Sequence, residues 1–250
     1  MRRDLVVRYA PFTLSLIVGA ALWEIGGRYT SAAFLVPLSE TLVRLEQLVQ
    51  SGELVRQTLS SLALFFVGLG LAALVGAPAG LALARWPALR RALDLYIMIL
   101  YATPMVALIP FILSLMGFGF APKVLVVFLF AVFPILYNTV EGARSLKPEL
   151  IEVARSFRSS EWALWRDVVM PYTLPFAMTG LRQAIGRALV GMIAAEFFLS
   201  STGLGQLIMT ASQNFDTGGL FAAILVIVVL GVGLMRLGRA IELHYARWRV

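Results

Sequence analysis

The sequence predicts an all-α membrane protein, a polytopic bundle of about six transmembrane helices. Hydrophobic residues fill 60% of the 250 positions and charged residues only 14%, whereas soluble domains are about 45–50% apolar and about 25% charged. The mean hydropathy is +0.85. Stretches without a charge run as long as residues 57–84, which is enough for a helix to cross a bilayer. These observations exclude an ordinary soluble enzyme and a disordered chain.

Six stretches are predicted to be spans, at about 11–27, 58–84, 95–116, 123–141, 173–199 and 218–238. Helices are favoured over barrel strands because the stretches are apolar on every side instead of alternating. A helix also satisfies its own backbone in lipid. The first stretch follows a basic segment but lacks a small-residue cleavage site, so we expect a retained helix rather than a signal peptide.

The basic residues predict the orientation. With the N-terminus in the cytoplasm, 15 of the 21 Lys and Arg residues fall on the inner side and four on the outer side. Cytoplasmic loops carry such an excess in membrane proteins. Both termini are therefore expected in the cytoplasm. The bias also explains the net charge of +7 without a nucleic-acid partner.

Residues 1–250 are expected to form one transmembrane domain with an outer excursion at 28–57 and an inner one at 142–170. The outer excursion contains Leu38, Leu42, Leu45 and Val49 at helical spacing, which predicts a short amphipathic helix. Ser39 is its expected N-cap residue. This helix either covers the bundle or forms part of a docking face for an external partner.

The inner excursion predicts two short amphipathic helices. Pro148 fits the first turn of a helix, and an apolar stripe follows it. Ser159 and Ser160 interrupt this helix, and a second one is expected to end before Pro171. Such helices can rest on lipid headgroups. That reading leaves the mixture of acids and arginines unexplained.

The inner excursion resembles the EAA loop of the membrane-spanning subunits of binding-protein-dependent ABC importers. Glu152 and Ala154 match its first residues, and Val168, Met170 and Pro171 match its apolar pair and proline. Arg158 stands where the family pattern has glycine, a residue that readily adopts positive φ. Four segments are also similar to the nitrate, sulfonate and taurine branch: SGELVRQTLSSL, TPMVALIPFILSLMGFG, FPILYNTVEGARSLKPEL and TGLRQAIGRALVGMIAAEF.

This resemblance, which covers residue 35 to the end, implies a cytoplasmic coupling helix. Its contacts with a separate ATP-binding subunit would be made by Glu152, Ala154, Phe157 and Arg158, with Pro171 closing the motif. The resemblance further implies two ATP-binding subunits, a second copy of the chain, an external or periplasmic solute-binding protein, and a place in the bacterial inner membrane. The implied cargo is a small organic or inorganic anion such as a sulfonate, taurine or nitrate.

The chain is not expected to be an enzyme or to hold a cofactor or metal. A P-loop needs a Gly-Lys pair, and residues Pro122 and Leu146 precede the only two lysines. There is no cysteine, and His244 is the only histidine. We therefore expect ATP hydrolysis on another chain.

Charged residues inside a span mark an internal pairing or a functional path. Arg182, Arg187 and Glu196 interrupt the fifth predicted span. The two arginines either extend toward the cytoplasmic end or line the translocation path, and Glu196 could instead tie two spans together. Tyr101, Thr103 and Met105, beside Pro104, are further candidates for the path.

Three other functions compete with that of an importer subunit. A secondary transporter driven by an ion gradient predicts mid-membrane acids and a repeated half, neither of which is evident. A membrane-embedded enzyme lacks a nucleophile–base pair. A purely structural or assembly subunit is not excluded by the sequence.

Overall fold

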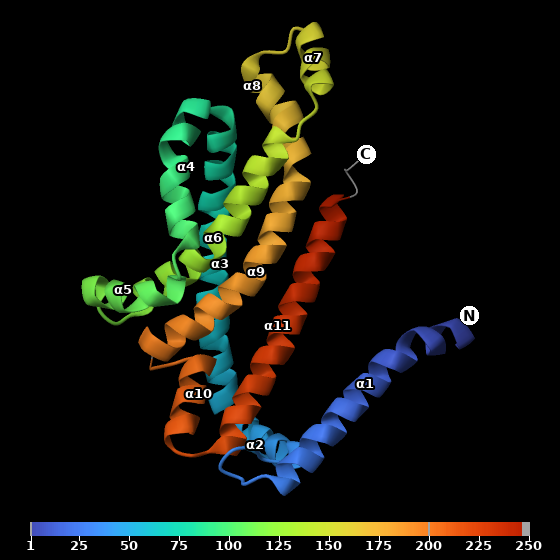
Figure 1. Cartoon of the computed structure of the whole chain (residues 1–250), viewed down its shortest axis with the longest axis vertical. Helices are drawn as coiled ribbons and strands as arrows, with labels where there is room; N and C mark the ends of the chain where they lie inside the picture. The colour runs from blue at the N-terminus through green and yellow to red at the C-terminus, as the bar shows by residue number, and fades with distance from the viewer. Residues whose placement is uncertain (1, 200, 247–250) are drawn as a thin grey trace. The chain divides into compact units, whose positions relative to one another are not determined.

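The computed structural model describes residues 2–199 and 201–246, and the described residues contain helices and no strand. They form two compact units (Figure 1). One unit comprises Met1–Leu59 and Thr202–Val228, and the other comprises Ser60–Ser201 and Val229–Val250. The prediction of an all-α chain is confirmed.

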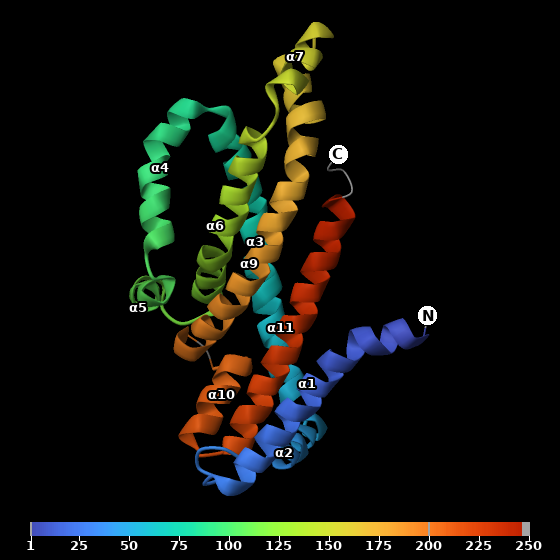
Figure 2. The ribbon, with the colours of Figure 1, turned by 45° about the vertical axis from the view of Figure 1, so that its right-hand side comes forward.

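The larger unit is built on two long helices that lie side by side, α6 (Phe120–Arg144) and α9 (Met170–Leu199) (Figures 1 and 2). Residues 60–85 of α3 (Glu53–Arg85) pack against them. Phe65, Val127 and Ala188 are fully buried in the shared core. Glycines allow this close approach. A Cβ on Gly180 of α9 would lie 2.8 Å from the carbonyl oxygen of Pro134 in α6.

The third predicted span is not a continuous helix. Helix α4 (Pro87–Ala102) ends before Thr103, and a 3₁₀ turn (Met105–Leu108) leads into α5 (Ile109–Met116). The two parts are bent by 92°. Pro104 is the physical reason, because proline has no N–H to continue the helix and disfavours the helical conformation of the residue before it. Thr103 accordingly has an extended backbone, with ψ of 131°.

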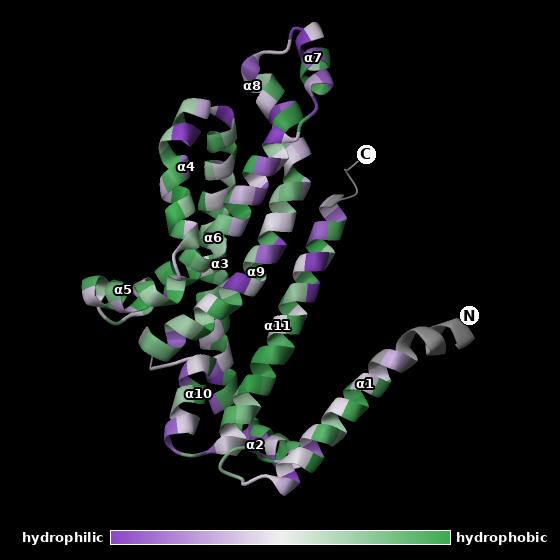
Figure 3. Cartoon of the chain, in the orientation of Figure 1, coloured by the Kyte–Doolittle hydropathy of each residue, from purple (hydrophilic) through white to green (hydrophobic). Residues whose placement is uncertain are grey.

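The other predicted spans all lie on helices. Among the described residues, three helices are long and apolar enough to cross a membrane by length and composition, namely α3, α6 and α11 (Thr217–Ala246), and the bent pair makes a fourth if it is one span. Helices α1 (Arg2–Tyr29) and α9 are long enough but fall outside this group. Figure 3 shows the apolar middle of α11 and the polar residues that interrupt α9.

The inner excursion forms α7 (Pro148–Ser156) and α8 (Glu161–Leu164), as predicted. The expected end before Pro171 is wrong. A π-helical turn (Trp165–Val169) joins α8 to α9 without a break, and Pro171 lies in the first turn of α9. The π-helical turn already departs from regular α-helical hydrogen bonding, since the N–H of Met170 donates to the carbonyl of Trp165. Proline, which has no N–H to donate, follows directly at this irregularity.

The smaller unit contains α1, α2 (Leu38–Gln50), α10 (Leu204–Gln213), and the first part of α11. The Trp23 indole donates to the carbonyl of Val36 at 3.1 Å. The outer excursion contains the predicted short helix but without the predicted cap or buried face. Its N-cap residue is Pro37, and the Ser39 backbone and hydroxyl donate to Glu24 instead. Its buried residues are Thr41 and Leu48, whereas Leu42 and Val49 are about half exposed.

Candidate coupling loop and translocation pocket

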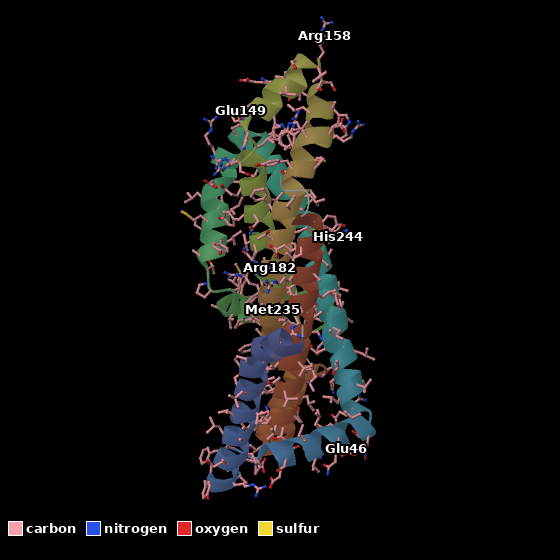
Figure 4. All side chains as sticks on the ribbon, turned by 90° about the vertical axis from the view of Figure 1, so that its right-hand side faces the viewer. Glu46, Glu149, Arg158, Arg182, Met235 and His244 are labelled. Carbon is pink, nitrogen blue, oxygen red and sulfur yellow. The ribbon has the colours of Figure 1, made fainter. Side chains whose placement is uncertain are left out.

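The turn after α7 is a Schellman motif with an arginine in the left-handed position. Arg158 has φ of +56°. Its N–H donates to the carbonyl of Arg155 at 2.9 Å, and the N–H of Ser159 donates to the carbonyl of Ala154 at 3.2 Å. These two bonds satisfy carbonyls that the end of a helix leaves without partners. The backbone conformation favoured by glycine is therefore kept although the residue is arginine, and Arg158 projects from the tip of the turn (Figure 4).

One face of α7 anchors the loop to the larger unit. Ala154 is buried together with Leu146, Leu164 and Val169. The Tyr172 hydroxyl donates to the carbonyl of Ser145 at 3.1 Å, which ties the start of α9 to the end of α6. The Ser160 side chain accepts a bond from the N–H of Ala163 and caps α8. The loop is thus held in one shape by packing and by caps.

The apolar stripe of α7 is not buried with Ala154. Leu150 is 42% exposed, Val153 54% and Phe157 81%. Glu152 is exposed beside them. Exposed apolar side chains in a row, rimmed by charge, are typical of a surface that binds another protein or a membrane. Around this row, α7, α8 and the turn between them carry many hydrophilic residues (Figure 3).

Charge contacts surround this surface. Arg155 lies 3.6 Å from Glu161, and the Arg85 guanidinium stacks 4.8 Å above the ring of Trp165. The side chains of Arg166 and Asp167 form a bidentate pair at 2.7 and 3.1 Å. The hydrogen bonds from Arg166 lower the pKa of Asp167. Both side chains of this pair are more than half exposed, so it contributes little to stability.

Four of the predicted path residues come together in one cavity of about 190 Å³. Tyr101, Thr103 and Met105 reach it from the break between α4 and α5, and Arg187 reaches it from α9. The Arg187 guanidinium carbon lies 5.5 Å from the centroid of the Tyr101 ring, a distance at which the cation attracts the ring face. Its Nη2 donates to the Tyr101 hydroxyl at 3.4 Å.

The other two path candidates lie elsewhere. The Arg182 Nε is 2.6 Å from a carboxylate oxygen of Glu242 in α11, in a charge contact rather than an aligned hydrogen bond. Figure 4 labels Arg182 beside α11. Glu196 is buried and accepts a hydrogen bond from Ser61 of α3 at 2.6 Å. Both side chains therefore tie helices together within the larger unit.

Comparison with known proteins identifies the family. Residues 72–247 match the family of binding-protein-dependent transport system inner membrane components. The chain belongs to this family. It is thus an ABC importer permease, and the resemblance of its inner loop to the EAA pattern agrees with that assignment.

The curated relatives of the permease have names that refer to different cargoes. It is 32% identical to a Bacillus subtilis protein named for aliphatic sulfonates transport, over 92% of this chain and 84% of the other. It is 35% identical to the riboflavin transport permease of Chloroflexus aurantiacus, over 95% and 89%. It is 34% identical to the bicarbonate transport permease of Synechocystis, over 72% and 65%.

Solved structures share the fold of the permease. An inward-facing MetNI methionine ABC transporter matches with a TM-score of 0.67 at 18% identity, over 78% of this chain and 97% of the other. An amino acid ABC transporter matches with a TM-score of 0.66 at 16% identity, over 80% and 97%. These likenesses support the fold alone.

The sequence of the permease does not reveal that Glu242 is the partner of Arg182. Glu242 lies beyond the predicted end of the last span at 238, and α11 continues to Ala246. The acid lies three residues beyond Arg239 in the polar last turns, and nothing in its local pattern marks it. Phe130 and Phe133, which line the cavity, are hidden in a uniformly apolar stretch of α6.

Proposed function

We propose that the chain is the membrane-spanning subunit of an ATP-driven importer and that α7 is its coupling helix. The observation that carries this proposal is the exposed apolar row of Leu150, Val153 and Phe157 on a helix whose other face is buried. A separate ATP-binding subunit would cover this row. Glu152 and Arg158 would lie at the edge of the contact with that subunit. Ala154 and Pro171 would not touch the subunit but would help to fix the loop to the rest of the chain.

The packing of the loop would let a displacement of α7 reach α9. Ala154 packs into the same cluster as Val169, at the entry to α9. The segment from α8 into α9 is continuous, so a displacement of α7 would reach the helix that carries Arg187 without crossing a flexible linker. A ligand shifts a conformational equilibrium only through different contacts in the two states. ATP-driven closure of the partner subunit would supply that difference at α7.

The path is proposed to form between two copies of the chain. The cavity within one copy measures only about 190 Å³, whereas ligand sites are commonly 300–1,000 Å³. Each copy would then bind one of two ATP-binding subunits. Residues 1–250 would act as one transmembrane domain, and an external or periplasmic solute-binding protein would deliver the cargo at the outer side.

The proposed location is the bacterial cytoplasmic membrane, with both termini in the cytoplasm. The distribution of Lys and Arg supports this orientation. In this orientation, α7 and the turn at Arg158 would lie on the side where ATP is available, and α2 would lie outside.

The proposed cargo is a small anion. Two relatives named for sulfonate and bicarbonate transport support this class. An ion-gradient-driven transporter is the alternative. The acid in the fifth predicted span does not favour it, because Glu196 is hydrogen-bonded to Ser61 of α3.

Charge reversal at Glu152 tests the proposal. We expect Glu152→Lys to insert and fold normally, to lose the co-purifying ATP-binding subunit, and to abolish uptake. Glu46→Lys is the matched control, because Glu46 is also an exposed helical acid but lies on α2. It should retain the ATP-binding subunit. Undiminished co-purification and uptake in Glu152→Lys would refute the coupling role.

A further inference from the structure

The two arginines of α9 differ in how their charge is compensated. The Arg182 side chain is neutralised by Glu242 at 2.6 Å. Among the described residues, the structure records no acid paired with Arg187 and only the contact with Tyr101. A cation without a counter-charge is costly within a membrane span and marks a functional site. Arg187 therefore needs a physical explanation that Arg182 does not.

Tyr101 orients the Arg187 guanidinium without neutralising it. The Tyr101 ring is itself fixed by edge contact with Tyr137 at 5.2 Å and by Phe133 at 5.8 Å. Its hydroxyl engages one nitrogen of the guanidinium, at a long 3.4 Å. Since a guanidinium carries five N–H donors, most remain available to a ligand in the cavity.

The cavity in front of Arg187 is small and otherwise mostly apolar. Its volume is about 190 Å³. Phe130, Phe133 and Leu129 form one wall. The Thr103 hydroxyl already donates to the carbonyl of Ile99 at 2.8 Å. Arg187 is the one charged donor among the residues that line this cavity. An apolar wall strengthens the attraction between a cation and an anion, because it lowers the local dielectric.

We propose that Arg187 selects the charge of the transported solute and binds the negative group of a small anion, with Tyr101 as the positioning residue. The proposal rests on the proposed function as a permease subunit and deepens it. A planar guanidinium matches the paired oxygens of sulfonates, carboxylates and bicarbonate. The bound anion supplies the counter-charge that the described residues do not. Arg182 has no part in this selection, because the carboxylate of Glu242 already neutralises its charge.

Anion-dependent thermal stability of the detergent-purified full chain, with its co-purifying subunits, tests the proposal. The probe is sodium methanesulfonate, titrated against sodium chloride at constant ionic strength, because chloride lacks the paired oxygens that match a guanidinium. Ligand binding to the folded state raises the melting temperature in a saturable way. We expect saturable stabilisation of the wild-type chain and about a ten- to hundred-fold weaker apparent affinity in Arg187→Gln, the loss expected for a charged hydrogen bond. Arg187→Lys should fall between the two.

Two controls separate charge selection from folding. The double variant Arg182→Gln with Glu242→Gln removes an arginine from the same helix at no change in net charge, and it should bind methanesulfonate as the wild type does. Dimethyl sulfone, the neutral near-isostere, should not stabilise the wild-type chain. This second control needs no variant, so it remains decisive if Arg187→Gln fails to fold.

The outcomes distinguish this proposal from the proposed function. Equal stabilisation by dimethyl sulfone, an unchanged response in Arg187→Gln, or no saturable response to methanesulfonate in the wild type would overturn the anion site. The permease assignment would stand in each of these cases if an ATP-binding subunit co-purifies. An Arg187-dependent response in a chain that purifies without such a subunit would support the anion site and contradict the proposed coupling.

Discussion

The close contact of α6 and α9 predicts that alanine is harmful at Gly180 and harmless at Gly186. A Cβ at Gly180 would lie 2.8 Å from the Pro134 carbonyl oxygen and 2.9 Å from the Ile135 Cα atom. Both are backbone atoms, so no side-chain rotation relieves the clash. The same carbonyl accepts a hydrogen bond from the Asn138 amide at 2.7 Å, which further fixes its place. At Gly186, on the same helix, the new Cβ would have no atom within 4 Å beyond its chain neighbours and the nearby backbone of α9.

The comparison isolates the steric cost of the contact. Both substitutions replace glycine with alanine inside α9, so the gain in helix propensity, about 1 kcal/mol, is common to both. Overpacking a tight contact costs typically about 1–3 kcal/mol. The free energy of unfolding of Gly180→Ala should therefore fall below that of Gly186→Ala by about 1–3 kcal/mol. For a chain of this length, that is roughly 2–12 °C in melting temperature.

Thermal unfolding of the two variants in one detergent measures this difference. Gly186→Ala should melt at or above the wild-type temperature, and Gly180→Ala should melt clearly below Gly186→Ala. Equal melting temperatures would mean that α6 and α9 are not packed as described at Pro134. The reasoning about their interface would then be refuted.

Two further predictions concern the loops. Arg158→Gly should stabilise the α7–α8 turn by up to about 1 kcal/mol and Arg158→Val should destabilise it, because φ is +56° there and side chains disfavour the left-handed region. Hydrogen exchange of the α7 amides reports both changes, and an identical response of the two variants would contradict the motif. Burial raises the pKa of Asp216, but the hydrogen bonds from Arg44 and from the N–H of Gly219, with the charge of Arg44, outweigh it and lower the pKa below its usual 3.8. The stability that this carboxylate contributes should be present above about pH 4 and be lost as the pH falls through the lowered pKa. The melting-temperature gap between wild type and Asp216→Asn should therefore close on acidification, and a gap that widens would contradict the pairing with Arg44.

The sequence predicts most of the helices because hydropathy and capping are local properties. The presence of α2 follows from apolar periodicity, and the start of α7 follows from Pro148. The break at Thr103 is less accessible, since proline inside an apolar stretch can either kink a span or end it. The structure shows the second outcome, with a bend of 92°.

The faces of the short helices depend on what packs against them, so periodicity alone does not give them. In α2 the buried residues are Thr41 and Leu48 rather than Leu42 and Val49. In α7 the small Ala154 is buried while Phe157 is exposed. Hydrophobicity favours Leu42 over Thr41, and bulk favours Phe157 over Ala154, so the tertiary neighbours decide both assignments.

The candidate site was predicted in part. Tyr101, Thr103, Met105 and Arg187 share one cavity, because the first three lie around the break at Pro104 and Arg187 reaches the same space from α9. Arg182 and Arg187 are both charged residues within one helix, and sequence alone does not tell them apart. The difference comes from Glu242, which is 60 residues further along the chain than Arg182.

The most direct test of the central claim, that α7 binds a separate ATP-binding subunit, is a single-cysteine cross-link. The natural chain has no cysteine, so Phe157→Cys introduces the only thiol at an 81% exposed position, the C-cap residue of α7. The control is Tyr29→Cys, at an 89% exposed position that is predicted to lie outside. In membranes containing the native partners, Phe157→Cys should cross-link to an ATP-binding subunit and Tyr29→Cys should not. A folded Phe157→Cys chain that cross-links to no such subunit, or only as much as Tyr29→Cys does, would contradict the account.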